Sequence, residues 1–150
     1  MTLEYRKGDL FSVTEGIIAH GCNAQGVMGS GVARIVRDKY PTAYKLYLHK
    51  HTTEGLTLGD VQVATVSESK LYIANMITQE FYGKSGKRFV SYDAVDDCFA
   101  NLMARNMRGL TINIPKIGAG LGGGDWNIIE AIIKSNIDNY TDQKVVVWEL

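Results

Sequence analysis

The apolar residues of this chain follow two patterns that alternate along its length. Short continuous apolar runs are typical of strands buried in a sheet, whereas apolar residues that recur every three or four positions are typical of helices that cover it. The runs predict strands at about 17–20, 61–66, 71–77, 110–115 and 144–150. At 3–7, an alternation of apolar and polar residues predicts an edge or half-buried strand. The helical repeats predict helices at about 30–40, 42–49, 91–108 and 125–140. Strands and helices in this order predict an α/β domain.

Two of the predicted strands, 61–66 and 71–77, are separated by only a short polar turn, which predicts an antiparallel hairpin. No internal repeat, low-complexity segment or linker interrupts the 150 residues. A chain of this length is typical of one domain with a substantial core. We therefore expect a single domain that spans residues 1–150.

A glycine-rich loop joins the predicted strand 17–20 to the predicted helix 30–40. It runs from His20 through Asn23 to Gly29, Ser30 and Gly31. Glycines let backbone N–H groups approach a ligand, and the start of the following helix adds further N–H groups and the positive end of its dipole. The loop is neither a Walker A motif nor the dinucleotide-binding fingerprint. It predicts an anion site, with a plain turn capped by Ser30 or Asn23 as the alternative.

A second glycine-rich loop, residues 118–124, follows the predicted strand 110–115. Asp125 comes next, at the position where it would cap the following helix. In an open α/β sheet, such loops lie at the carboxyl ends of the strands, where ligands bind. Two anion-holding loops at one edge fit a diphosphate better than a single phosphate.

Composition narrows the classes of partner. The 16 basic and 16 acidic residues balance, which argues against a dedicated nucleic-acid-binding domain. Cys22 and Cys98 make neither a disulfide framework nor a zinc site, and His49 and His51 are expected to be solvated. We expect no metal and no cofactor. The N-terminus lacks a signal-peptide pattern and no run of about 18 apolar residues occurs, so we expect a cytoplasmic protein that does not contact a membrane.

Three motifs, taken in order, resemble those of the macrodomain family of ADP-ribose-binding modules over nearly the whole chain. They are Gly8-Asp9-Leu10, then Asn23 with Gly29-Ser30-Gly31-Val32, then Ile117-Gly118-Ala119-Gly120-Leu121-Gly122. The first loop is also similar to that of the ADP-ribose 1''-phosphate phosphatase branch, by the spacing of His20, Asn23, Gly26, Gly29 and Gly31 and the following Tyr40-Pro41. The resemblance implies a three-layer α/β/α domain around a central mixed sheet of about six strands.

The same resemblance implies a site for ADP-ribose or its 1''-phosphate in a monomeric protein. Asp9 would accept a hydrogen bond from the adenine amino group, with the Leu10 amide beside it. The two glycine loops would hold the diphosphate from either side, Asn23 would bind the distal ribose, and Tyr82 would cover that ribose. The residues expected to contact the ligand are Asp9, Leu10, Gly21, Asn23, Gly29, Ser30, Gly31, Val32, Tyr82, Ile117, Gly118, Ala119, Gly120, Leu121 and Gly122.

Three functions fit this resemblance. In a phosphatase, His20 would be a general acid or base, or would instead orient a water or attack phosphorus directly. Asn23 would position the ribose, and Asp125 would position a water unless it only caps its helix. A buried His20 with a structural role is the alternative. The second function is an eraser that removes ADP-ribose from a protein or nucleic acid. The related branch uses a lysine and an aspartate for this, but here Lys84 is only a loose candidate and Gly122 replaces the aspartate. The third function is a reader that binds ADP-ribose without turnover.

Overall fold

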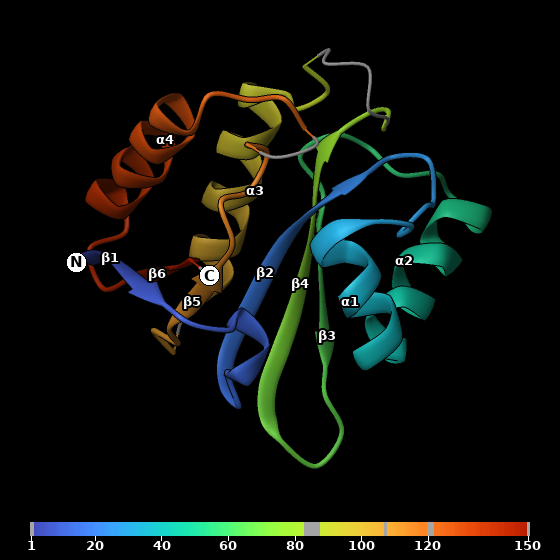
Figure 1. Cartoon of the computed structure of the whole chain (residues 1–150), viewed down its shortest axis with the longest axis horizontal. Coiled ribbons are helices and arrows are strands. Elements are labelled where there is room, and N and C mark those ends of the chain that lie inside the picture. The colour runs from blue at the N-terminus through green and yellow to red at the C-terminus, as the bar shows by residue number, and fades with distance from the viewer. Residues whose placement is uncertain (1, 83–87, 107, 120–121, 150) are drawn as a thin grey trace.

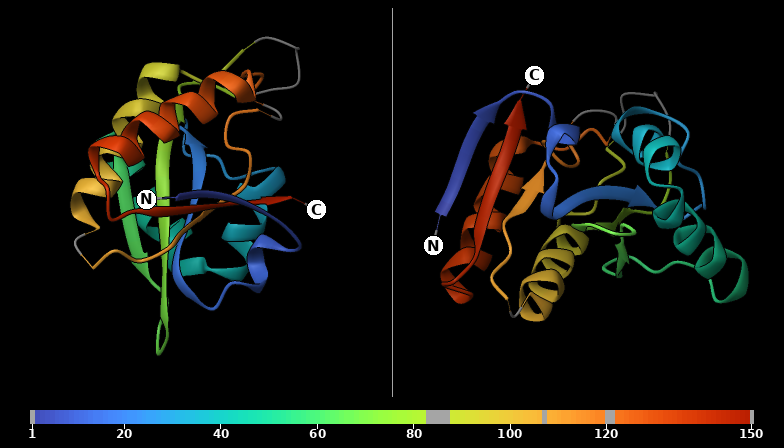
Figure 2. Two further views of the ribbon diagram at one scale, coloured as in Figure 1. Left: turned by 90° about the vertical axis from the view of Figure 1, so that its left-hand side faces the viewer. Right: turned by 90° about the horizontal axis from the view of Figure 1, so that it is seen from below.

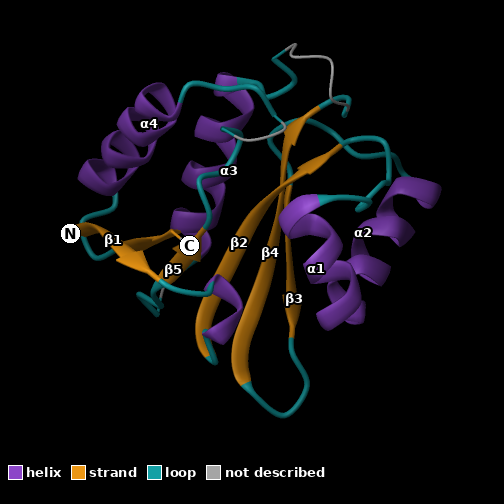
Figure 3. Ribbon diagram, in the orientation of Figure 1, coloured by secondary structure: helices purple, strands orange, loops and turns teal. Residues whose placement is uncertain are grey.

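A computed structural model describes residues 2–82, 88–106, 108–119 and 122–149 of the chain. The described residues form a single six-stranded sheet in the order β1-β6-β5-β2-β4-β3 (Figures 1 and 3). The strands are β1 Thr2–Lys7, β2 Glu15–Asn23, β3 Val61–Thr65, β4 Lys70–Gln79, β5 Ile112–Ile114 and β6 Lys144–Glu149. The helices are α1 Gly31–Lys39, α2 Pro41–Thr53, α3 Tyr92–Arg105 and α4 Trp126–Asn139, with a short 3-10 turn η1 at Leu10–Ser12.

Every neighbouring pair of strands is parallel except β3 and β4, which are antiparallel. The predicted mixed six-stranded sheet and the predicted hairpin are therefore confirmed. Because β1, β6, β5, β2 and β4 run the same way, their carboxyl ends share one edge of the sheet. Both glycine-rich loops leave the sheet at that edge.

Helices cover both faces of the sheet, as the three-layer prediction requires. Figure 2 shows α1 and α2 on one face and α3 and α4 on the other. Alternate side chains of β2 enter the two resulting cores. Ile17 and Ala19 pack with α3 and α4, whereas Ile18 packs with α1. This alternation also decides on which face the polar residues of β2 lie.

Some boundaries differ from those predicted. β2 continues to Asn23, with a register shift between Cys22 and Asn23, so Asn23 belongs to the strand rather than to the loop that follows it. β5 is only three residues long, and α2 extends to Thr53. The extension of β2 follows from its neighbour β4, which offers apolar pairing positions as far as Ile77. Over the described ranges, no helix is long and apolar enough to cross a membrane.

Candidate functional site

Three connections meet at the carboxyl edge of the sheet: the β2–α1 loop, the β4–α3 connection and the β5–α4 loop. Backbone hydrogen bonds tie them together. The Ala24 N–H donates to the carbonyl of Glu80 at 3.2 Å, which joins the first loop to the end of β4. The N–H groups of Phe89 and Val90 both donate to the Gly122 carbonyl, at 2.7 and 3.0 Å. The two glycine-rich loops are therefore held in one place by the connection between them.

The start of α1 is open. Its N-cap residue, Ser30, has the extended backbone of a cap (φ −152°, ψ 163°) but makes no side-chain hydrogen bond to the helix. Gly31 follows at φ +59°, and a side chain added there would meet no atom within 4 Å. The first N–H groups of a helix have no partner inside it. At α1 no side chain caps them, and they lie at the positive end of the helix dipole, an environment that can bind phosphate groups.

The other two helices that begin near this edge, α3 and α4, are capped by side chains. Ser91 accepts a hydrogen bond from the Ala94 N–H at 3.1 Å at the start of α3. Asp125 accepts one from the Asn127 N–H at 2.9 Å at the start of α4. Asp125 therefore caps α4, which is one of the two roles predicted for it. Of these three helices, only α1 begins without a side-chain cap.

The second loop needs its glycines because it packs tightly. A Cβ at Gly118, where φ is +77°, would lie 2.7 Å from Cγ2 of Val90. A Cβ at Gly122 would lie 2.8 Å from the carbonyl oxygen of Gly118. The close packing keeps the loop backbone low over the ends of the strands. Ile117 is buried beneath the loop and Ala119 is half-buried in it, whereas Gly120 and Leu121 lie outside the described residues.

Asn23 organises the first loop. Its Oδ1 accepts hydrogen bonds from the Gln25 N–H at 2.9 Å and from the Tyr47 hydroxyl at 2.9 Å. Its Nδ2 donates to the Val27 carbonyl at 2.8 Å, and only 8% of the residue is exposed. These bonds fold the loop back on itself. The side-chain amide therefore has little hydrogen-bonding capacity left for the ribose contact predicted for Asn23. In this structure the side chain stabilises the conformation of the first loop.

His20 lies in the core and not among the loops at the carboxyl edge of the sheet. The residue has 0% exposure on the α1–α2 face of the sheet, and its Nε2 lies 2.7 Å from Oδ1 of Asn75. The Nδ2 of Asn75 in turn donates to the Ala43 carbonyl of α2 at 3.0 Å. Burial lowers the pKa of His20 to about 4, although the bond to Asn75 opposes that shift. The predicted acid–base role requires access to the ligand and a pKa near neutrality. In this structure the position offers neither, which favours the structural alternative, and the acid–base role stays a prediction.

The adenine side of the predicted site lies at the end of β1. Asp9 is exposed there, and its Oδ1 accepts the Phe11 N–H at 2.9 Å as the cap of η1. Leu10 is buried at 6% exposure. Among the described residues, no hydrogen bond uses the second carboxylate oxygen of Asp9, which leaves an acceptor available for an amino group.

The remaining predicted contacts lie near the middle of the edge. Gly21 is half-buried beside Thr78, whose hydroxyl would lie 2.8 Å from a Cβ at that glycine. Tyr82 is 54% exposed at the end of the described part of the β4–α3 connection. Lys84 lies outside the described residues. No group of three or more His, Cys, Asp or Glu side chains in the described ranges is arranged to hold a metal ion.

The sequence did not reveal three residues that support the site. Tyr47, predicted only as an apolar helix position, holds Asn23 through its hydroxyl. The ring of His51, predicted to be solvated, packs against Gly26, where a Cβ would lie 2.5 Å from the ring. Asn75 holds His20. A polar residue inside the apolar run 71–77 was the signal available for Asn75. No local signal marked the other two.

Comparison with known proteins identifies the family of this chain. The family model described as Macro domain matches residues 19–133. The ADP-ribose 1''-phosphate phosphatase of Lodderomyces elongisporus is 33% identical, over 89% of this chain and 91% of that protein. The DNA ADP-ribosyl glycohydrolase of Mycobacterium tuberculosis is 24% identical, over 97% of this chain but 42% of that protein.

A solved structure of a Bacteroides thetaiotaomicron protein of unknown function superposes with a TM-score of 0.88 at 32% identity, covering 100% of this chain and 99% of that one. The family model spans most of the chain, from the middle of β2 into α4. It also includes both glycine-rich loops. The family indicated by the three motifs is thereby confirmed: the chain belongs to the Macro domain family.

Proposed function

We propose that this Macro domain binds ADP-ribose and removes the terminal phosphate of ADP-ribose 1''-phosphate. The Lodderomyces relative named for that reaction supports the proposal, since the similarity covers nearly the whole length of both proteins. The observation that carries it is the uncapped start of α1, where Ser30 makes no cap bond and the space over Gly31 is open. The second glycine-rich loop leaves the neighbouring strand β5. Together they suit a diphosphate.

In the proposed complex, each part of the ligand meets a different element. The free carboxylate oxygen of Asp9 accepts the adenine amino group, and the open N–H groups of α1 hold the diphosphate. The second loop and Tyr82 enclose the distal ribose. Asn23 contributes by fixing the first loop through its bonds to Gln25 and Val27.

The proposed reaction is the hydrolysis of a phosphate ester. A water oxygen attacks phosphorus, the bond between phosphorus and the ribose 1'' oxygen breaks, and that oxygen takes a proton. The products are inorganic phosphate and ADP-ribose. Negative charge spreads over the phosphoryl oxygens in such a step, so hydrogen-bond donors matter more than covalent participation by the protein. Backbone N–H groups of the second loop are proposed as these donors. The exposed carboxylate of Asp125, at the end of that loop, is proposed to orient the water.

The test is phosphate release from ADP-ribose 1''-phosphate, measured beside ADP-ribose binding. Asp125→Asn keeps a capping side chain but removes the charge, so turnover should fall while ADP-ribose affinity stays. His20→Gln should keep both activities, because the side chain does not reach the cleft. If His20→Gln loses turnover but still binds ADP-ribose, His20 takes part in the reaction. A wild type that binds ADP-ribose without releasing phosphate would refute the phosphatase assignment.

Removal of ADP-ribose from nucleic acid is the second candidate, favoured by two exposed aromatic residues beside the cleft. Phe81 and Tyr82 are 58% and 54% exposed directly after β4, and aromatic faces stack on unpaired bases. The similarity to the Mycobacterium tuberculosis glycohydrolase is compatible with this function. Release of ADP-ribose from modified single-stranded DNA tests it. Phe81→Ala should weaken that reaction without changing phosphate release.

A further inference from the structure

An arginine that the proposed function does not yet use lies beside the second glycine-rich loop. Arg88 belongs to the β4–α3 connection, four residues before α3 begins, and its side chain is exposed. The next two residues, Phe89 and Val90, are those whose N–H groups donate to the Gly122 carbonyl, at 2.7 and 3.0 Å. These bonds fix the backbone that follows Arg88 to the second loop.

The side chain of Arg88 is held by an aromatic ring. Its Cζ lies over the ring of Tyr92, 4.5 Å from the centroid, which is within the roughly 6 Å range of a cation–π interaction. The hydroxyl of the same tyrosine accepts a hydrogen bond from the backbone N–H of Asp125 at 3.0 Å. One side chain therefore joins the guanidinium to the residue at which the second loop ends and α4 begins.

A hollow of about 380 Å³ opens at this place, within the range of about 300–1,000 Å³ that is typical of small-molecule sites. Two of its lining residues, Arg88 and Asp93, are charged. Asp93 lies in the first turn of α3, where a carboxylate stabilises the helix through its dipole, so this residue has a structural reason of its own. The hollow is lined by Arg88, Phe89, Val90, Ser91, Tyr92 and Asp93.

The charge of Arg88 is not balanced by the part of the chain that the structure describes. The ion pairs between described residues involve other cations, and none joins Arg88 to a carboxylate within 4 Å. A guanidinium that lies over a ring uses its flat face for that contact. Its N–H groups point outward in the plane, where they can donate to an anion. Tyr92 therefore orients Arg88 without occupying its donors.

The nearby ligand group in the proposed complex is the one on the 1'' carbon, since the second loop and Tyr82 enclose the distal ribose. A phosphomonoester carries about −1.5 to −2 charges at neutral pH and offers three acceptor oxygens. The fork of an arginine can bind two such oxygens at once. The carboxylate of Asp125, at the end of the same loop, would repel the phosphate unless a cation lay beside it. Arg88 is the cation that Tyr92 holds there.

We propose that Arg88, oriented by Tyr92, binds the 1''-phosphate and makes the site distinguish ADP-ribose 1''-phosphate from ADP-ribose. The assignment rests on the proposed function, because it requires the distal ribose at the second loop. The diphosphate is held separately, at the start of α1. Figure 2 shows α1 on the face of the sheet opposite to α3, the helix that Arg88 precedes. Arg88 therefore adds affinity for the 1''-phosphate alone.

The experiment is a pair of calorimetric titrations, one with ADP-ribose and one with a phosphonate analogue of ADP-ribose 1''-phosphate. In the analogue a CH₂ group replaces the ester oxygen, so no hydrolysis interferes with binding. The wild type should bind the phosphonate at least about tenfold more tightly than ADP-ribose. Arg88→Gln should remove this difference and leave the Kd for ADP-ribose unchanged. Arg88→Lys, which keeps the charge but loses the fork, should retain only part of it.

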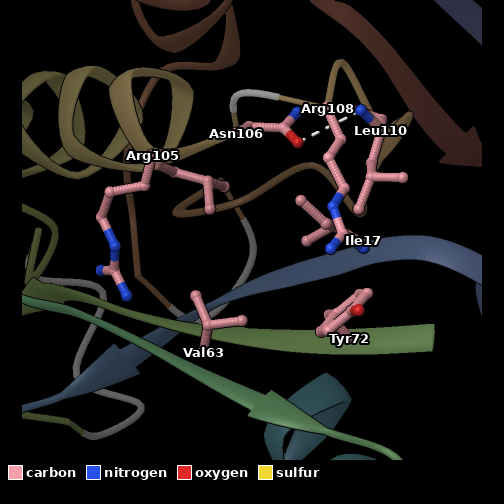
Figure 4. A pocket seen from close by; sticks show the side chains of 8 residues that line it. Ile17, Val63, Tyr72, Arg105, Asn106, Arg108 and Leu110 are labelled. Atoms are coloured by element: carbon pink, nitrogen blue, oxygen red, sulfur yellow. Dashed lines mark hydrogen bonds between the residues drawn. The ribbon is translucent and has the colours of Figure 1, made fainter. Parts of the chain in front are cut away.

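Arg108→Gln is the matched control. Arg108 is also exposed and has no ion pair among the described residues, but it lines a cavity at the amino ends of the strands (Figure 4). The glycine-rich loops lie at the opposite edge of the sheet. Arg108→Gln removes the same charge far from the proposed site, so both Kd values should equal those of the wild type.

The outcomes separate this assignment from the phosphatase reaction itself. A wild type that releases no phosphate, but binds the phosphonate more tightly than ADP-ribose through Arg88, supports the assignment while the proposed reaction fails. A wild type that releases phosphate, with Arg88→Gln binding the phosphonate normally, overturns the assignment and leaves the reaction in place. Equal wild-type affinity for the two ligands also overturns it. So does an equal loss of both ligands in Arg88→Gln, because that would show an effect on the whole site.

Discussion

Ser30→Asp tests the open start of α1 through two measurements that should move in opposite directions. Ser30 already has the extended backbone of an N-cap residue but makes no side-chain bond to the helix. An aspartate there would accept from the first helical N–H groups and place a negative charge at the positive end of the dipole. An N-cap bond contributes about 1 kcal/mol and the dipole about 0.3–1 kcal/mol. The free energy of unfolding should therefore rise by about 1–2 kcal/mol.

The same aspartate should weaken ADP-ribose binding, because it occupies the N–H groups proposed for the diphosphate and repels its charge. Two like charges about 4 Å apart repel by about 1 kcal/mol in water and about 4 kcal/mol at a protein surface of lower effective dielectric. Taking roughly 2 kcal/mol for an open cleft, the Kd should rise about thirtyfold. Part of this loss should disappear at high salt, which screens exposed charges.

Urea denaturation and isothermal titration calorimetry with ADP-ribose measure the two effects. Ser30→Ala is the matched control, and it should change stability little because the native serine makes no cap bond. A more stable variant that binds ADP-ribose as tightly as wild type would show that the diphosphate does not use α1. A variant that is not stabilised would show that the helix N–H groups are not available, which would remove the basis of the proposed function.

Four further predictions concern the supporting residues. Burial lowers the pKa of His20 from 6.5 to about 4. Between these values the unfolded chain binds a proton that the folded chain does not, so stability should fall by about 3 kcal/mol as the pH drops through this window. His20→Gln, which cannot titrate, should lose most of this dependence in urea denaturation, and an unchanged pH profile would contradict it. Tyr47→Phe removes the hydroxyl that donates to the Asn23 carbonyl and leaves that carbonyl without this partner, so it should lower the free energy of unfolding by about 1–3 kcal/mol and weaken ADP-ribose binding in calorimetry. Gly118→Ala should lower thermal stability more than Gly55→Ala, because both have positive φ but only the first would meet neighbouring atoms; equal losses would refute the packing argument. Asp9→Ala should raise the Kd for ADP-ribose about tenfold or more, as one charge-assisted bond is lost, and an unchanged Kd would remove Asp9 from the site.

Two residues of one motif have surroundings in the structure that the sequence did not indicate. His20 and Asn23 are three positions apart in the first loop motif, and the resemblance assigned both to catalysis. The structure places His20 in the core beneath α2. It directs the side chain of Asn23 toward the backbone of the loop that follows this residue. Side-chain alternation along β2 puts His20 on the same face as Ile18, toward α1 and α2. The motif defines the spacing of these residues, but the contact with Asn75 and Ala43 comes from elements far along the chain.

The sequence by itself determined the α/β class, the six strands, the β3–β4 hairpin, the two glycine-rich loops and the family. These features follow from local periodicity and from motifs whose residues are close in the chain, so the sequence pattern contains them directly. The tertiary structure decided which helix start stays open, that Tyr47 holds Asn23 across 24 positions, and that His20 is sealed from solvent. Such arrangements depend on how distant segments pack against one another. Only this packing decides which side chains are buried and which hydrogen-bonding groups stay unpaired, so the local sequence pattern does not contain them.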